Sequence, residues 1–231
     1  MPFLKTQDAK AVRERFAEEL KEPVVVDLFV RPKSKLVLPG HEDCMYCEEA
    51  KELLQEVADL SDLITLKVHD IDQDAALASE LGITEVPAMV MAGSARGKVR
   101  FLGIPLGYEF ATLLGDLIDV STGSTALAKP TLKALADLDK DVTIKVFVTP
   151  TCPYCPGPAR MAHQMAIESD RVIAEVIEVS EFPEMGEKYA VQGVPKIVFN
   201  DEVELVGAQP EGVFLQAVLE AVGASPAPAS R

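Results

Sequence analysis

The sequence lacks features on which several classes of protein depend. It contains no run of about 18 apolar residues, so we expect no membrane-spanning helix. Positive charge is scarce, because 22 Lys and Arg stand against 37 Asp and Glu, giving a net charge of -15. This excess of negative charge repels phosphate backbones and anionic lipids. We therefore expect neither nucleic acid nor a membrane surface as a partner.

The first ten residues also lack the apolar core of a secretory signal, because charged side chains interrupt them from Lys5 onward. We therefore expect a cytoplasmic protein. Asn is nearly absent, with Asn200 alone among 231 residues. Few Asn residues are typical of heat-adapted proteins, which predicts a thermophilic source.

Cysteine is scarce as well, and its four positions form two C-x-x-C pairs, Cys44-Met-Tyr-Cys47 and Cys152-Pro-Tyr-Cys155. Corresponding cysteines of the two pairs are 108 residues apart. The constant spacing indicates an internal repeat, which has to be identified before any fold is assigned.

The repeat extends beyond the cysteines. A Val-Pro step follows each pair, and its prolines, Pro87 and Pro195, are again 108 residues apart. Upstream, residues 28–30 match 146–148 at an offset of 118, so the first copy has ten extra residues. These fall in residues 31–43, which contain two Pro and one Gly and are predicted to form a loop.

Downstream of the Val-Pro step the offset falls to 104, as two matched pairs show: Gly103 with Gly207, and Phe110 with Phe214. The second copy therefore has a hairpin that is four residues shorter. Insertions and deletions confined to loops are what a duplicated fold predicts.

Each copy is predicted to contain the same series of elements. β-Branched apolar runs predict strands, and apolar residues at helical spacing predict helices. In the first copy the predicted elements are helix 8–20, strand 24–30, helix 48–60, strand 64–68, helix 74–81, strands 88–91 and 98–102, and helix 110–120. In the second copy they are helix 132–138, strand 142–148, helix 159–168, strand 172–179, helix 184–190, strands 196–199 and 204–206, and helix 212–222. The predicted fold class is α/β, with two tandem units that each have a mixed sheet flanked by helices.

Composition predicts the boundaries of the two units. Residues 121–130 are rich in Ser, Thr, Gly and Ala and form the predicted junction. We therefore expect one unit over residues 1–120 and a second over 121–222. Residues 223–231 offer too little apolar surface to pack, which predicts a flexible tail.

A C-x-x-C pair has three ordinary uses, which are zinc binding, a structural disulfide and dithiol–disulfide exchange. Zinc sites made of two pairs usually separate them by about 15–20 residues, but here Cys47 and Cys152 are 105 apart. A disulfide across two residues closes too small a loop to stabilise a fold strongly. Exchange fits best, because the N–H groups at the start of a helix favour a thiolate. A redox-inert zinc-binding protein is the alternative from another class.

At this point the residues resemble a known family. A strand, a C-x-x-C pair that opens a helix, and a Val-Pro step before a hairpin resemble the thioredoxin fold. Residues 149–155, Thr-Pro-Thr-Cys-Pro-Tyr-Cys, are similar to glutaredoxin. Two such units in tandem resemble the protein disulfide oxidoreductases of thermophilic archaea and bacteria, over about residues 20–222.

The resemblance implies redox-active disulfides, Cys44–Cys47 and Cys152–Cys155, with no bound cofactor or metal. It implies that the enzyme reduces, forms or isomerises disulfides in client proteins. It also implies a flavoprotein of the thioredoxin reductase type as electron donor. Related tandem folds carry electrons to a peroxidase, so a dedicated relay to a peroxiredoxin or hydroperoxide reductase is the alternative enzyme.

The resemblance further assigns roles around the cysteines. Pro87 and Pro195 are expected to be cis. The residues expected to bind substrate are Val86, Pro87, Val194, Pro195, Tyr46 and Tyr154. In thioredoxins a buried acid on the first strand assists proton transfer at the second cysteine, and Asp27 is the candidate here. Asp27 lies one step off the usual spacing.

The two sites differ in their charged neighbours. Glu42, Asp43, Glu48 and Glu49 flank the first pair, whereas the second pair has no charged neighbour before Arg160. Negative charge near a thiolate raises its pKa. We therefore predict that Cys152 is the more reactive thiolate and attacks the client disulfide, and that Cys155 resolves the resulting mixed disulfide. The first pair is then the slower relay or the site that receives electrons from the reductase, and His41 beside it is a bystander.

Two other residues of the second copy carry smaller predictions. Prolines are accepted where a helix begins, but Pro158 lies late enough to kink the first turn of the helix that follows the second pair. His163 is expected to be a packing or surface residue.

Overall fold

The computed structural model describes residues 2–32 and 44–224. The predictions made for residues 33–43, including His41, Glu42 and Asp43, lie outside the described residues. The same holds for 225–231, the larger part of the predicted tail.

Both copies contain the predicted series of elements, each with a helix in front. The elements of the first copy are α1 (Thr6–Glu19), β1 (Val24–Val30), α2 (Cys47–Ala58), β2 (Ile64–Asp70), α3 (Ala75–Leu81), β3 (Ala88–Ala92), β4 (Lys98–Leu102) and α4 (Glu109–Thr122). Those of the second are α5 (Lys129–Ala136), β5 (Val142–Val148), α6 (Pro156–Glu168), β6 (Val172–Glu178), α7 (Pro183–Lys188), β7 (Lys196–Phe199), β8 (Val203–Val206) and α8 (Glu211–Ala221).

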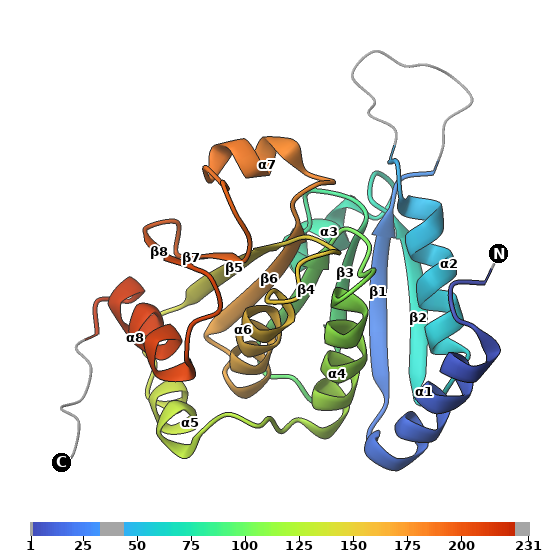
Figure 1. The fold of residues 1–231 in the computed structure, drawn as a ribbon, viewed down its shortest axis with the longest axis horizontal. Helices are drawn as coiled ribbons and strands as arrows, with labels where there is room; N and C mark the ends of the chain where they lie inside the picture. Colours follow the sequence, from blue (N-terminus) through green and yellow to red (C-terminus); the bar gives the residue numbers. More distant parts are fainter. Residues whose placement is uncertain (1, 33–43, 225–231) are drawn as a thin grey trace.

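The strands of both copies form one sheet of eight, in the order β2-β1-β3-β4-β6-β5-β7-β8. Each copy contributes four strands in the same internal order, and the copies lie side by side in Figure 1, blue to green on the right and yellow to red on the left. They are joined where β4 pairs in parallel with β6, from Lys98 opposite Ile173 to Leu102 opposite Ile177. The α/β class, with two tandem units that each have a mixed sheet flanked by helices, is therefore as predicted, but the joining of the two sheets into one was not predicted.

The strand register reproduces the sequence offsets. In the first copy Leu28 of β1 lies opposite Met89 of β3, and in the second Val146 of β5 lies opposite Ile197 of β7. The first members of these pairs differ by 118 residues and the second members by 108. Met89 also faces Phe101, and Ile197 faces Leu205, which is 104 residues after Phe101. Insertions thus change the loops and leave the strand pairing intact.

The sheet separates two apolar layers. On one face the strands pack against α1, α2, α4, α5, α6 and α8, and this larger core includes all four cysteines. On the other face a smaller core contains Phe29 of β1 and Phe147 of β5, with Ala78 of α3 and Tyr189 beyond α7. Successive side chains of a strand point to opposite faces, and the six inner strands, β1, β3, β4, β5, β6 and β7, contribute to both layers.

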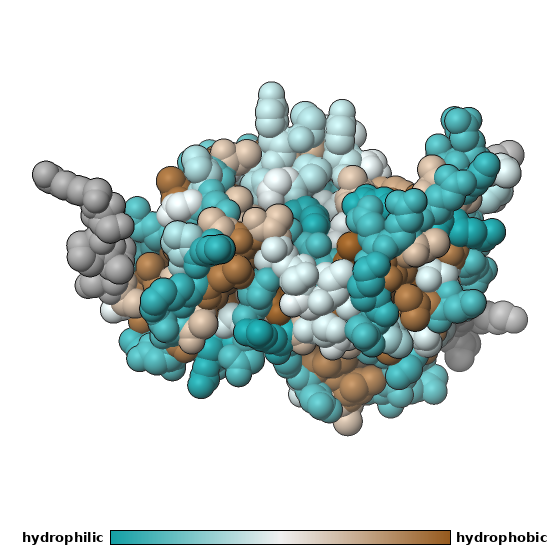
Figure 2. All heavy atoms as spheres, turned by 90° about the horizontal axis from the view of Figure 1, so that it is seen from below, coloured by the Kyte–Doolittle hydropathy of each residue, from teal (hydrophilic) through white to brown (hydrophobic). Residues whose placement is uncertain are grey.

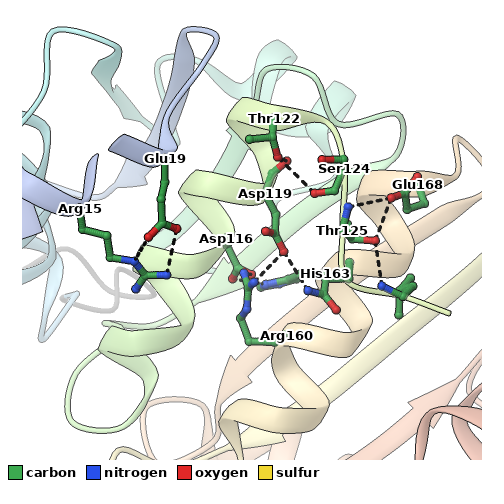
Figure 3. Close-up of polar contacts among 12 residues, drawn as sticks. Arg15, Glu19, Asp116, Asp119, Thr122, Ser124, Thr125, Arg160, His163 and Glu168 are labelled. Atoms are coloured by element: carbon green, nitrogen blue, oxygen red, sulfur yellow. Dashed lines mark hydrogen bonds and ion pairs between the residues drawn. The ribbon is translucent and has the colours of Figure 1, made fainter. Parts of the chain in front are cut away.

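Polar side chains join α4 of the first copy to α6 of the second (Figure 3). Arg160 of α6 donates to Asp116 and Asp119 of α4, with 2.6 Å between nitrogen and oxygen in each case. His163, fully buried, lies 2.6 Å from Asp116 through Nδ1 and 2.9 Å from the carbonyl oxygen of Arg100 through Nε2. Because both ring nitrogens face acceptors, His163 is held on both sides. It packs in the interior, as one of the two expectations had it, but its place in this polar cluster was not predicted.

Apolar surface is scattered on the side away from the carboxyl end of β1. Figure 2 shows this side, where hydrophilic residues cover most of the face and apolar residues form separate groups. Within residues 2–32 and 44–224, none of the helices has the length and continuous apolar sequence of a bilayer span.

Candidate active site

Both C-x-x-C pairs lie at the same edge of the sheet. The pairing directions make β1, β2, β4, β5 and β6 run the same way. The pairs follow β1 and β5, so both stand at the carboxyl ends of these strands. This is the edge at which open α/β sheets usually bind ligands.

The cysteines of each pair form a disulfide, Cys44 with Cys47 and Cys152 with Cys155, and the Cα atoms of each pair are 5.5 Å apart. Cys47 is the first residue of α2, and Cys155 immediately precedes α6. Each first cysteine therefore lies just outside the amino end of a helix, where unpaired N–H groups and the helix dipole stabilise a thiolate once the disulfide is reduced.

Burial distinguishes the two members of a pair. Cys155 is fully buried, and Cys152 is 8% exposed. Tyr154, one of the two residues between them, is 70% exposed. Tyr154 therefore forms the surface of the second site, and Cys155 lies behind it in the core.

The Val-Pro steps lie beside the cysteine pairs. Both prolines are in cis, as the resemblance implied. At the second site the Sγ of Cys152 lies 3.8 Å from the carbonyl oxygen of Val194. At the first site Cys44, Val86 and Pro87 line one cavity. The structure thus brings both predicted Val-Pro steps to the cysteines.

The same backbone contact holds the proline loop in each copy of the repeat. The N–H of Gly103 donates to the carbonyl oxygen of Pro87, and the N–H of Gly207 donates to that of Pro195, both at 2.8 Å. Both glycines have positive φ, +97° and +78°. The pair matched by sequence at an offset of 104 therefore makes an equivalent contact in both copies.

The prolines around the second pair suit the start of α6. The prediction that Pro158 kinks the first turn is wrong. The first hydrogen bond of the helix runs from the N–H of Ala159 to the carbonyl oxygen of Cys155. Pro156 and Pro158 therefore occupy positions whose N–H would have no partner within the helix. The helix begins at Pro156 rather than at Ala159.

Among the described residues, the charges near the two cysteine pairs differ. Glu48 and Glu49 lie in the first turn of α2, whereas the first turn of α6 has no acidic residue. Arg160 of α6 is engaged by Asp116 and Asp119. Its charge is neutralised by these partners, so the first turns of the two helices differ by the glutamates of α2.

The first site has a cavity to which both copies contribute. Its volume is about 310 Å³. Its walls come from the first copy and from the segment after β6 in the second, and the lining includes Arg31, Cys44, Tyr46, Pro87, Glu181 and Phe182. Tyr46, predicted to bind substrate, lines this cavity. The contribution of the second copy was not predicted.

The structure does not bring Asp27 to the cysteines. Its neighbours along β1, Val26 and Leu28, point into the core that contains Cys47, so Asp27 points to the opposite face. There its Oδ1 lies 2.8 Å from Nε2 of His69, which stacks on Phe29. The sheet separates Asp27 from the disulfide, and this placement corrects the expectation that it assists proton transfer at Cys47.

Two other carboxyl groups near the sites were not identified from the sequence. Glu109, the first residue of α4, is 1% exposed, and its burial raises its pKa to about 7. The preceding N–H, of Tyr108, donates to the carbonyl oxygen of Pro150 at 3.0 Å, close to the second pair. Glu181 lies in the cavity at the first pair, and burial raises its pKa to about 7 as well. In the sequence both are ordinary members of an acidic chain.

Among residues 2–32 and 44–224, no group of three or more His, Cys, Asp or Glu residues is arranged to hold a metal ion. Each cysteine pair is instead closed as a disulfide.

Comparison with known proteins shows which family the chain is similar to. The model of the thioredoxin domain matches residues 142–220. Thioredoxin of Methanocaldococcus jannaschii is 37% identical over 78 residues, which are 33% of this chain and 92% of that protein. The crystal structure of a protein disulfide oxidoreductase from Aeropyrum pernix K1 has a TM-score of 0.84 at 30% identity, covering 96% of each chain.

A subunit of the alkyl hydroperoxide reductase of Escherichia coli K12 is 28% identical over 161 residues. These residues are 69% of this chain but 29% of that relative, so the chain spans less than a third of its length.

Two thioredoxin-fold units, each with a C-x-x-C disulfide, define a thiol–disulfide oxidoreductase. The chain belongs to the thioredoxin family, and in length and tandem arrangement it is similar to the protein disulfide oxidoreductase of Aeropyrum pernix. The predictions of fold class, family and enzyme class are thereby confirmed.

Proposed function

We propose that the protein exchanges disulfides with a range of client proteins, and that Cys152 is the residue that attacks them. The Cys152 thiolate attacks a client disulfide, one client sulfur leaves as a thiolate, and a mixed disulfide forms. The Cys155 thiol then loses its proton and attacks Cys152, which closes the Cys152–Cys155 disulfide and releases the second client thiol. Two electrons pass to the client. Run in reverse, the same steps oxidise a client dithiol.

One observation carries this proposal: Cys152 lies 3.8 Å from the carbonyl oxygen of Val194, beside the exposed Tyr154. The backbone next to Pro195 can pair with an extended client segment as a strand does, and this holds the client sulfur at Cys152. We propose the same arrangement for Val86 and Pro87 at Cys44, with Tyr46 in place of Tyr154.

We assign the first pair, Cys44 and Cys47, to electron delivery. It would accept electrons from a flavoprotein of the thioredoxin reductase type and pass them to clients or to the second pair. The units proposed for the two activities are residues 1–120 and 121–222. We propose a cytoplasmic location, where disulfide chemistry is normally catalytic rather than structural.

Reduction of insulin disulfides by dithiothreitol tests the proposal, with the wild type, Cys44→Ser and Cys152→Ser compared in parallel. We expect activity in the wild type, loss of nearly all of it in Cys152→Ser, and a partial loss in Cys44→Ser. A wild type without activity would overturn the general-reductase assignment. An unchanged rate in Cys44→Ser would remove the first pair from the route.

A second candidate function is a dedicated relay from a flavoprotein reductase to a peroxiredoxin. It is favoured by the similarity of 69% of this chain to part of an alkyl hydroperoxide reductase. A dedicated relay should reduce insulin poorly and a peroxiredoxin rapidly. Supplying a peroxiredoxin and a reductase in place of insulin therefore separates the two candidates.

A further inference from the structure

The second copy reaches the first active site because of the way the sheet is joined. β4 and β6 run in parallel as neighbours, so the segments that follow them leave the sheet side by side. Glu181 follows β6, and its Oε1 accepts a hydrogen bond from the backbone N–H of Ile104, which follows β4, at 2.8 Å. A carboxyl group of the second copy is thereby held in the first.

Ile104 belongs to the frame of the first site. It is 4% exposed and packs against Ala50 and Leu53 of α2, the helix that begins at Cys47. The residue before it, Gly103, donates its N–H to Pro87. The segment that holds Glu181 therefore also contacts the helix and the proline loop on either side of the first pair.

Glu181 and Cys44 line the same cavity. Glu181 Oε2 is buried and has no hydrogen-bond partner among the described residues, so this oxygen is free to accept a proton or a hydrogen bond. The charged and titratable residues that line this cavity, or the adjoining one along α7, besides Glu181 itself are Arg31, Cys44, Tyr46, Glu85, Glu184 and Lys188.

Burial raises the pKa of Glu181 to about 7, the hydrogen bond from Ile104 opposes this, and the charge of Glu178 adds to it. A carboxyl group with a pKa near the working pH can both accept and donate a proton. The hydrogen bond from Ile104 holds Glu181 in the cavity that Cys44 also lines. Its pKa of about 7 makes this carboxyl group suitable for proton transfer.

The repeat does not account for Glu181. At the offset of 108 its counterpart in the first copy is Gln73, which is exposed and donates to Asp70 at 2.7 Å. Gln73 follows β2, at an outer edge of the sheet. The position of Glu181 is special because β6 lies next to the other copy.

We propose that Glu181 takes up and returns the protons of the first pair, so that the first site is completed by a residue of the second copy. This inference rests on the proposed exchange function. In the reduced protein the Cys44 thiol gives its proton to the Glu181 carboxylate, directly or through one water, and the thiolate attacks a disulfide. The sulfur that leaves takes the proton back from Glu181. Cys47 then loses its proton and closes the disulfide with Cys44, and the second released sulfur gains that proton.

Leaving groups of different basicity test the proposal in a Cys152→Ser/Cys155→Ser background, where the first pair alone reacts. Glutathione disulfide releases a basic thiolate that needs a proton, whereas Ellman's reagent releases an acidic thiol that does not. We expect Glu181→Gln to slow the reaction with glutathione disulfide by about tenfold or more at pH 7. The reaction with Ellman's reagent should slow much less, because solvent can take the proton of Cys44 and the acidic leaving group needs no proton from Glu181.

Two controls keep the test specific. Glu187→Gln removes an exposed carboxylate from α7, away from the cavity, and should leave both rates unchanged. Glu181→Asp should restore part of the rate with glutathione disulfide. Equal loss with both reagents, as expected for a merely structural role, or no loss with either, would overturn the proposal. Neither result bears on insulin reduction by Cys152, so a failure here and a failure of the proposed function are distinguishable.

Discussion

The Nδ1 of His163 lies 2.6 Å from Oδ2 of Asp116, and both side chains are fully buried between α4 and α6. His163 belongs to the second copy and Asp116 to the first, so this contact joins the two units (Figure 3). Nε2 of the same ring donates to the carbonyl oxygen of Arg100. Loss of the imidazole would leave Oδ2 of Asp116 and the carbonyl oxygen of Arg100 buried without this partner, while Arg160 still contacts Oδ1 of Asp116.

His163→Leu should therefore reduce the free energy of unfolding by about 3 kcal/mol, even though leucine fills a similar volume, because two buried acceptors each lose a hydrogen bond. Urea unfolding followed by circular dichroism measures it. The matched control is Arg15→Leu, which breaks the exposed pair of Arg15 and Glu19 visible in the same view. Its effect should stay below about 0.5 kcal/mol. Similar losses in both variants would show that the buried pair contributes no more than the exposed one.

The buried carboxyl of Glu109 should make stability depend on pH. Burial raises its pKa from 4.5 to about 7 in the folded protein, so folding favours the protonated form. Its contribution is fully present below pH 4.5 and is lost as the pH rises through 7. As the pH rises from 4.5 through 7, the free energy of unfolding of the wild type should fall by about 3 kcal/mol relative to that of Glu109→Gln. Unfolding of both proteins in urea at pH 4.5, 6 and 8 gives the difference. A difference that does not change with pH would contradict a protonated, buried Glu109.

The two reduced pairs should differ in thiol acidity. Glu48 and Glu49 lie in the first turn of α2 beside Cys44, and no acidic residue lies in the first turn of α6 beside Cys152. Alkylation of the reduced protein by iodoacetamide, followed by mass spectrometry of each cysteine, should reach half its maximal rate for Cys152 about one pH unit below Cys44. Glu48→Gln/Glu49→Gln should move Cys44 toward Cys152 and leave Cys152 unchanged. If Cys44 alkylates at the lower pH, the proposed order of the two sites is reversed.

The sequence was informative where local pattern and repeat agree. Residues 24–30 and 142–148 are β-branched and apolar because the sheet is covered on both faces, and the structure places β1 and β5 at these residues. The offsets of 118, 108 and 104 describe which residues pair within each copy. The alternation of side chains along β1 also places Asp27 on the other face of the sheet from Val26 and Leu28. Its orientation away from Cys47 could therefore have been predicted.

The contacts between the copies could not be predicted in this way. A repeat gives the same information twice, and nothing in it specifies that β4 pairs with β6. The contact of Glu181 with Ile104, and the burial of Glu109, depend on that pairing and on the packing of α4 against α6. In the sequence Glu109 and Glu181 are two of 37 Asp and Glu residues and follow no distinct pattern.

The paired glycines offer a test of how far the two copies have diverged. Gly103 and Gly207 both have positive φ and both donate to a proline carbonyl, so alanine at either position meets a similar backbone penalty, of about 1 kcal/mol. Their surroundings differ. A Cβ on Gly103 would lie 2.8 Å from Cβ of Glu178 and 2.9 Å from Oε1 of Glu181, whereas nothing lies within 4 Å of a Cβ on Gly207. Gly103→Ala should therefore be the more destabilising change, by about 1–2 kcal/mol over Gly207→Ala in urea unfolding.

Gly103→Ala should also slow glutathione disulfide reduction by the first pair, because the contact of Glu181 with Ile104 must shift. Equal losses of stability would mean that the segment after β6 yields easily, which contradicts a firmly held Glu181.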